Sequence, residues 1–317
     1  MENLLFAIVC GPFAVIATVL NVIFLFCLHH PAEGVNLRQP LRFLLIALIG
    51  NSLIQQGTIV LTVLLAFLQA SELLLIVSKA VVYLTYSSCF SSSAWISIFY
   101  YIKIVPHTCA LLNWIKKNIR IIACSGFILD QTVLLTAMSI GTASHLLPLL
   151  HPPNSASSPF NGTMSAEDNK LTALLLNVCN LIFFIYLICP LLTLTASWIK
   201  TFVYLRGHIS RMKQTKESST SSQLKNQMRV TVMGIVQAAV FLPSCSWTLF
   251  TVFVYSTPTF VRIDGNKHIL ITISSISDLA IIVCLGFSQS VFRLRAASAL
   301  KRLKKALGIL DHTDTGS

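Results

Sequence analysis

Charged side chains are scarce in this sequence. Asp, Glu, Lys and Arg make up 11% of the 317 residues, whereas an ordinary soluble domain carries roughly 25%. Hydrophobic residues make up 55%, and the mean hydropathy is +0.76. These values argue against a water-soluble chain. The formal net charge of +12 sits in short clusters between long uncharged stretches, which argues against nucleic-acid binding as the main function.

Sequence motifs for catalysis and metal binding are also missing. The sequence contains no GxSxG, HExxH, Walker-A or GxGxxG motif, and its eight histidines include no pair spaced i, i+4. The nine cysteines form no CxxC or Cys/His pattern typical of zinc sites, and all lie in or beside hydrophobic stretches. We interpret them as small buried apolar residues. We therefore predict no enzymatic activity, no cofactor and no metal.

What the sequence does contain is seven long hydrophobic stretches. A membrane-spanning helix needs roughly 20 mostly apolar residues, and the stretches are too long and too continuous for barrel strands. The predicted spans are residues 3–28, 41–68, 80–105, 120–142, 171–203, 229–256 and 268–292. The sequence therefore predicts an all-α membrane protein, in which residues 1–317 form a single seven-transmembrane helix bundle.

Positive charge is distributed unevenly between the two sides of this bundle. All but four of the 23 Lys and Arg fall in loops one, three and five and in the C-terminal tail; the exceptions are Lys79, Lys170, Arg262 and Lys267. Because cytoplasmic loops are enriched in Lys and Arg, we predict that the N-terminus is outside and the C-terminus is cytoplasmic. Residues 293–310 alternate leucines with cations, which predicts a short amphipathic helix on the inner membrane surface.

A single glycosylation sequon, Asn161-Gly162-Thr163, lies between the fourth and fifth spans. The charge distribution independently assigns this loop to the outside. We therefore predict that Asn161 is glycosylated, with a chance tripeptide as the alternative.

Two carboxylates lie inside predicted spans, and such residues are functional candidates by default. Asp278 lies ten residues after His268, about 15 Å along a helix. It could face a cationic ligand, a polar neighbour on another helix or Lys79, and an interhelical hydrogen bond is favoured. For Asp130 we expect a hydrogen bond to a polar neighbour. A transporter is therefore an alternative function, although the sequence does not show the matched broken helices that are typical of secondary transporters.

Two motifs narrow the class of membrane protein. Residues 99–104 at the end of the third span read Phe-Tyr-Tyr-Ile-Lys-Ile, and residues 114–117 read Trp-Ile-Lys-Lys. In the fifth span, Pro190 is followed 15, 18 and 22 residues later by Leu205, His208 and Met212. Both motifs resemble those of the bitter taste receptors, the type 2 taste receptors, whose third span ends in Phe-Tyr-x-x-Lys-Ile.

The resemblance covers most of the chain, with some departures. Asn21 in the first span and the sequon at Asn161 also fit the family. Asn51 stands where the family carries an Arg in the second span. Val82 and Tyr86 stand where many members carry the Trp and Asn that touch ligand.

The resemblance implies a G-protein-coupled chemosensory receptor in the plasma membrane. Such a receptor binds bitter small molecules and activates a heterotrimeric G protein of the gustducin/Gi type, surrounded by membrane lipid and without a nucleic-acid partner. A vomeronasal type 1-like pheromone receptor and, less favoured, a small membrane transporter are the alternatives. The vomeronasal receptors share the outline of the bundle but not the two motifs.

Two sets of candidate site residues follow. The predicted ligand-binding residues, in the outer halves of spans three, six and seven, are Val82, Tyr83, Tyr86, Trp247, Tyr255, Ser277 and Asp278. The predicted G-protein-coupling residues are Tyr100, Lys103, Lys116, His208, Met212 and Arg229. For any single aromatic residue, helix packing or a position in the interfacial belt is the competing interpretation, and inner-leaflet lipid is the competing partner for the cations.

Overall fold

The computed structural model describes residues 2–29, 40–106, 109–150, 166–214, 221–256, 268–289 and 292–298, and within these ranges every regular element is a helix. The labelled helices are α1 (Glu2–His29), α2 (Leu41–Phe67), α3 (Glu72–Ile104), α4 (Ala110–Lys117), α5 (Ile119–Leu150), α6 (Ala166–Gln214), α7 (Ser221–Ser256) and α8 (His268–Ser288). All except α4 contain a segment long and apolar enough to cross a membrane, which makes seven such helices among the described residues. The predicted all-α fold is confirmed for the described residues, with seven helices that could cross a membrane.

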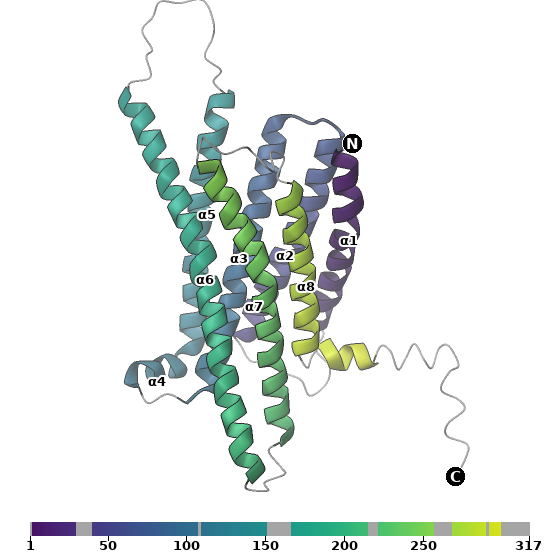
Figure 1. Cartoon of the computed structure of the whole chain (residues 1–317), viewed down its shortest axis with the longest axis vertical. Helices are drawn as coiled ribbons and strands as arrows, with labels where there is room; N and C mark the ends of the chain where they lie inside the picture. Colours follow the sequence, from purple (N-terminus) through teal and green to yellow (C-terminus); the bar gives the residue numbers. More distant parts are fainter. Residues whose placement is uncertain are drawn as a thin grey trace, which may run out of the picture.

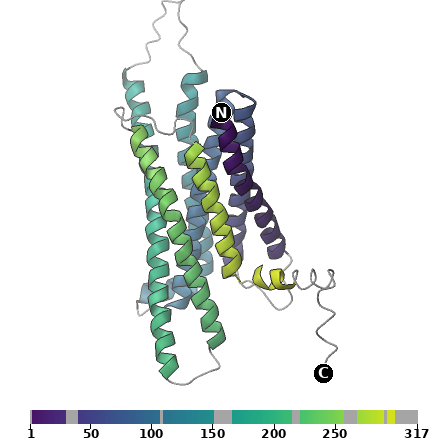
Figure 2. The same cartoon turned by 45° about the vertical axis from the view of Figure 1, so that its right-hand side comes forward.

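The seven long helices form one bundle in which α3 is central. Helix α3 contacts α2, α5 and α6, while α8 contacts α7 and α1 and so closes the bundle (Figures 1 and 2). The N-terminus, the end of α5 and the start of α6 lie at one end, called here the N-terminal end (Figure 1). Helix α4, the end of α6 and the start of α7 lie at the opposite end, called here the basic end (Figure 1).

The bundle is apolar outside and partly polar inside. On α1, Leu5 and Ile8 are 65% and 63% exposed, whereas Asn21 on the same helix is fully buried. On α2, Gln55 and Gln56 are also fully buried. Exposed apolar and buried polar side chains are unfavourable in water, because water solvates large apolar side chains poorly and amides well. Lipid favours it, because apolar surface can face acyl chains while polar side chains bond between helices.

Several helices extend beyond their predicted spans, because hydropathy detects the lipid-embedded part of a helix and not its hydrogen-bonded ends. Helix α3 begins at Glu72, eight residues before the predicted start at 80, and so includes Lys79. A lysine near a helix end keeps its charge in the interface while its stem lies along the helix. Helix α6 spans Ala166–Gln214, beyond both ends of the predicted span 171–203, and its additional turns carry charged residues.

Two features near the basic end also differ from the prediction. The sequence analysis did not predict α4, an eight-residue helix on which Leu111 and Trp114 are exposed beside Lys116 and Lys117. Helix α8 ends at Ser288 and not at 292, and a separate helical stretch covers residues 292–298. This stretch turns away from the axis of α8 (Figure 2). The remainder of the predicted surface helix 293–310 lies outside the described residues.

Close packing between α6 and α7 depends on a glycine, which gives a first testable prediction. A β-carbon at Gly234 would overlap the ring of Trp198, which is itself buried, so in Gly234→Ala the ring or one of the two helices must shift. Overpacking of this kind costs about 1–3 kcal/mol. We expect the purified Gly234→Ala variant to unfold several degrees below the wild type. Gly57→Ala is the matched control, because a β-carbon there meets no atom within 4 Å; equal melting of the two variants would contradict the packing.

Candidate functional site

The predicted ligand-binding residues on α3 lie on the inner side of the bundle. Val82 and Tyr86 are 4% exposed. The hydroxyl of Tyr86 shares a hydrogen bond of 2.6 Å with Oγ of Ser244 on α7. The ring of Tyr86 also lies 5.7 Å from the ring of Phe90, which in turn packs on Phe241 of α7 at 3.9 Å between centroids. This group therefore joins the middle of α3 to the middle of α7.

Two further aromatic residues lie near this group. The ring of Tyr83 packs edge-on against Phe183 of α6, with 6.0 Å between centroids. Trp247 lies one turn after Ser244 on α7 and packs against Phe250. Its indole N–H is buried and has no hydrogen-bond acceptor among the described residues. An amphipathic ring with an unused donor is a group that a small molecule can bind through both surface area and a directional bond.

Asp278 does not join the aromatic group through its hydrogen bonds but bonds to α2. Its Oδ2 accepts a bond of 2.6 Å from Oγ of Ser52 and a bond of 2.7 Å from Nε2 of Gln56. Ser52 in turn accepts a bond of 2.6 Å from Nδ2 of Asn21 on α1. The partners are thus polar neighbours on other helices, one of the three possibilities that the sequence left open. Its proposed contact with ligand stays a prediction.

The remaining ligand-site predictions are less well defined. Ser277 is buried beside Asp278 on α8. Tyr255 lies in the last turn of α7, but its side chain is outside the described part of the chain. The structure therefore brings Tyr86 together with Ser244, which the sequence analysis missed. Val82 packs instead in a separate apolar cluster with Phe6, Ile59 and Ile271, and Asp278 bonds toward α2.

A second group lies at the basic end of the bundle, around Tyr100. Its hydroxyl donates to Oε1 of Gln289 at 3.3 Å and accepts from Nε2 of the same side chain at 3.1 Å. Gln289 directly follows α8, so this pair joins the end of α3 to the end of α8. The Tyr100 ring also lies 5.7 Å from the ring of Trp198 on α6. Tyr100 thus ties three helices together.

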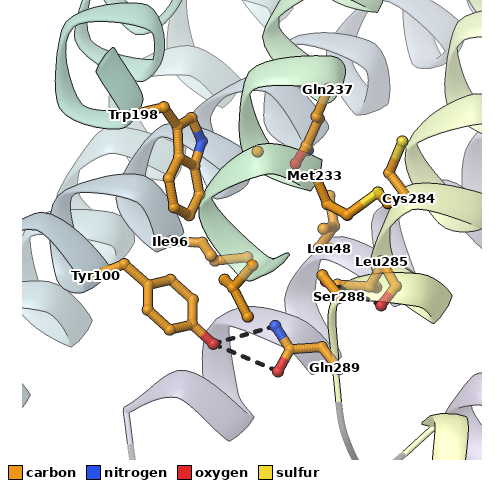
Figure 3. A pocket seen from close by; sticks show the side chains of 12 residues that line it. Leu48, Ile96, Tyr100, Trp198, Met233, Gln237, Cys284, Leu285, Ser288 and Gln289 are labelled. Atoms are coloured by element: carbon orange, nitrogen blue, oxygen red, sulfur yellow. Dashed lines mark hydrogen bonds between the residues drawn. The ribbon is translucent and has the colours of Figure 1, made fainter. Parts of the chain in front are cut away.

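A small cavity lies beside Tyr100, between α2, α3, α6, α7 and α8 (Figure 3). The cavity has a volume of about 20 Å³, which is room for about one water molecule. In Figure 3, Tyr100 and Gln289 lie on one side of it, with Trp198 and Gln237 on the other. Its lining residues are Leu48, Ile96, Tyr100, Trp198, Val230, Met233, Gly234, Gln237, Cys284, Leu285, Ser288 and Gln289. None of the predicted ligand-binding residues is among them.

The other predicted G-protein-coupling residues lie on helices that reach this end. Lys103 is exposed, with its Nζ 5.4 Å from the centroid of the Phe99 ring. Lys116 on α4, His208 on α6 and Arg229 on α7 are exposed as well. Met212 lies in α6, and its side chain is outside the described part of the chain. Exposed cations at the same end as a half-buried tyrosine suit either an acidic protein surface or anionic lipid.

The second intramembrane carboxylate has the polar neighbour that the sequence predicted. Oγ of Ser91 on α3 donates to Oδ2 of Asp130, and the hydroxyl of Tyr186 on α6 donates to the Asp130 backbone carbonyl at 3.1 Å. The next residue, Gln131, accepts a bond from Ser88 on α3. Asp130 therefore helps to join α5 to α3 and α6.

The structure also tests the prediction that the cysteines are small buried residues. All nine cysteines are free, but Cys109 and Cys189 are exposed, so their interpretation as buried residues is wrong. Cys189 faces outward from α6, where lipid can cover an apolar thiol, and Cys109 directly precedes α4.

Asn161, the predicted glycosylation site, lies outside the described residues. Among the described residues, no group of three or more His, Cys, Asp or Glu could hold a metal ion.

Comparison with known proteins adds no relative. No family model matches the chain, and no curated protein matches its sequence. Function is therefore inferred from the residues and geometry of this chain itself.

Proposed function

We propose that this chain is a G-protein-coupled chemosensory receptor of the bitter taste type, which binds small molecules within the bundle and activates a gustducin/Gi-type G protein. The observation that carries the proposal is the environment of the Phe-Tyr-x-x-Lys-Ile motif at the end of α3. Tyr100 of this motif is turned inward onto Gln289, whereas Lys103 is exposed at the basic end. One motif thus combines a contact between helices with a charged surface available to a partner.

The group around Tyr86 supports a ligand site in the half of the bundle nearer the N-terminal end. Phe90 and Phe241 supply apolar surface, Tyr86 and Ser244 supply hydroxyls, and Trp247 supplies a ring with an unused N–H. This combination of apolar surface and a few directed polar groups is typical of small-molecule sites.

Helix α3 offers a mechanical link between the two groups. It is continuous from Glu72 to Ile104, and Tyr86 and Tyr100 are separated by 14 residues, about 21 Å at 1.5 Å per residue. A ligand that replaces the Tyr86–Ser244 bond changes how α3 packs on α7. We propose that the active state has a different packing at the Tyr100–Gln289 pair, which opens the basic end to the G protein. An agonist favours the active state only if it binds the active state more tightly than the resting state.

The proposed orientation has the N-terminus outside and the basic end in the cytoplasm, with the chain in the plasma membrane. It is supported by the concentration of Lys and Arg in loops one, three and five and in the C-terminal tail of the sequence, and by the exposed Lys103, Lys116 and Arg229. G protein and anionic inner-leaflet lipid would both meet these cations.

The function is tested by measuring calcium release in cells that express the chain with a chimeric G protein. The cells are challenged with a panel of bitter alkaloids, terpenoids and steroids, and mock-transfected cells serve as the control. We expect at least one compound to produce a response that requires the chain. Silence from a chain shown to be at the cell surface would favour the pheromone-receptor or transporter alternatives.

The bond between α3 and α7 gives a prediction about potency. Tyr86→Phe leaves Ser244 without its partner, and an unsatisfied buried hydroxyl costs about 1–3 kcal/mol. We expect Tyr86→Phe and Ser244→Ala each to shift the agonist concentration for half-maximal response by several-fold. The double variant should shift it by less than the two single shifts combined, because both changes remove the same bond. Strictly additive shifts would show that the two residues act separately.

A transporter is the second candidate, because a carboxylate buried in mid-membrane is a common feature of ion and substrate pathways. Asp278 is 2% exposed and lies about halfway along α8. Under this alternative, purified chain in liposomes would carry a substrate flux that Asp278→Asn abolishes. The receptor proposal expects no such flux.

A further inference from the structure

A buried polar cluster joins α1, α2 and α8 in the middle of the bundle. Asn21, Ser52, Gln56, Ser275 and Asp278 are linked by four hydrogen bonds of 2.6–3.0 Å. All five side chains are at most 2% exposed. Of these five residues, only Asp278 is among the predicted ligand-binding residues, and none is among the predicted G-protein-coupling residues.

The hydrogen bonds in the cluster run toward the carboxylate. Asn21 donates to Ser52, and Ser52 then donates to Oδ2 of Asp278. Ser275 donates to Oε1 of Gln56, whose Nε2 donates to the same Oδ2. Two bonds therefore reach one carboxylate oxygen, as suits an ionised acid. The second oxygen, Oδ1, is buried and has no hydrogen-bond partner among the described residues.

Other unpartnered oxygens lie in the same region. Oδ1 of Asn21 is buried without a partner, although Nδ2 of the same amide is part of the cluster. Gln55 is fully buried, and neither its oxygen nor its nitrogen has a partner in the described ranges. Gln55 lies three residues after Ser52 and next to Gln56, so these three side chains share one face of α2.

Such a cluster lacks a positive charge. A carboxylate taken out of water without compensation costs several kcal/mol. The side chains that interact with Asp278, Ser52 and Gln56, are both neutral. A proton on Oδ1 could donate to only one of the unpartnered oxygens. A metal cation instead binds the lone pairs of several oxygens together.

We propose that this cluster is a binding site for a monovalent metal cation, of the size and hardness of sodium, held by Oδ1 of Asp278 and the amide oxygens of Asn21 and Gln55. Donors that are all oxygen select hard cations. One carboxylate among neutral amides and hydroxyls balances one positive charge, whereas calcium sites draw on several carboxylates. The bound ion stabilises the arrangement in which α1, α2 and α8 bring these oxygens together.

The test is the thermal unfolding of the purified full chain in detergent, with sodium chloride compared against choline chloride at equal ionic strength. A ligand that binds only the folded state raises the unfolding temperature with its concentration. We expect the wild type to melt several degrees higher in sodium than in choline. Asn21→Ala should require more sodium for the same rise, and Asp278→Asn should lose the rise. Asp130→Asn is the matched control, because it alters the other intramembrane carboxylate, and it should keep the rise.

Equal melting of the wild type in sodium and choline would overturn the proposal, and so would loss of the rise in Asp130→Asn. Melting that depends on pH but not on sodium would instead assign the charge compensation to a proton. If Asp278→Asn does not fold, the wild-type cation comparison and the Asn21→Ala titration still decide. The measurement needs no agonist or G protein, so its failure and the failure of the receptor proposal are distinguishable.

Discussion

Lys103→Ala is expected to lower agonist-stimulated G-protein activation by about tenfold or more, while the amount of chain at the cell surface stays unchanged. Lys103 is exposed at the basic end of α3, so its loss leaves the core of the bundle intact. A charged contact with a partner is worth about 1.5–3 kcal/mol, and 1.4 kcal/mol corresponds to a factor of ten. The measurement is the concentration–response curve for calcium release, normalised to surface labelling.

Lys117→Ala is the matched control for this prediction. It removes the same charge from the same end of the bundle, but from α4 and not from the Phe-Tyr-x-x-Lys-Ile segment at the end of α3, and Lys117 is not among the predicted coupling residues. We expect it to signal close to the wild-type level. If Lys103→Ala signals normally at normal surface expression, Lys103 is not a coupling residue.

Asp278→Leu is expected to lower the yield of folded chain. Leucine accepts no hydrogen bond, so the Ser52 hydroxyl and the Gln56 amide would become unpartnered donors in the middle of the bundle. Each unsatisfied donor costs about 1–3 kcal/mol, and a typical domain is stable by only about 5–15 kcal/mol. The expected result is a smaller monodisperse peak than that of the wild type in size-exclusion chromatography of detergent-extracted chain.

Asp278→Asn is the control for the shape of the side chain, since its amide oxygen can still accept from Ser52 and Gln56. It should give clearly more folded chain than Asp278→Leu. Equal yields of the two variants would show that these hydrogen bonds contribute little to folding.

The membrane spans could be predicted from sequence because lipid imposes a one-dimensional requirement on each helix. Twenty consecutive apolar residues are visible without any knowledge of neighbouring helices. The helix ends were less predictable, since Lys79 interrupts the hydropathy pattern of α3 without interrupting its backbone hydrogen bonds. Helix α4 escaped prediction because eight residues with two lysines resemble a loop.

The candidate site could be predicted only in part. Asp278, Tyr86 and Tyr100 stand out as rare residue types or as members of a motif. Their partners Ser52, Ser244 and Gln289 do not, because the relative rotation and register of two helices decide which residues meet. One signal was available: the fully buried residues Ser52, Gln55 and Gln56 fall at i, i+3 and i+4 of an otherwise apolar helix, which indicates a polar face turned toward other helices.

The most direct test of the proposed receptor function is nucleotide exchange on a purified gustducin/Gi-type G protein, reconstituted with the purified chain in lipid nanodiscs. A compound identified in the cellular panel is added or withheld, and the Lys103→Ala variant is measured beside the wild type. The proposed function predicts exchange that requires both the chain and the compound and that is strongly reduced by Lys103→Ala. Exchange that does not respond to the compound, together with transport of that compound by the chain into liposomes, would contradict it.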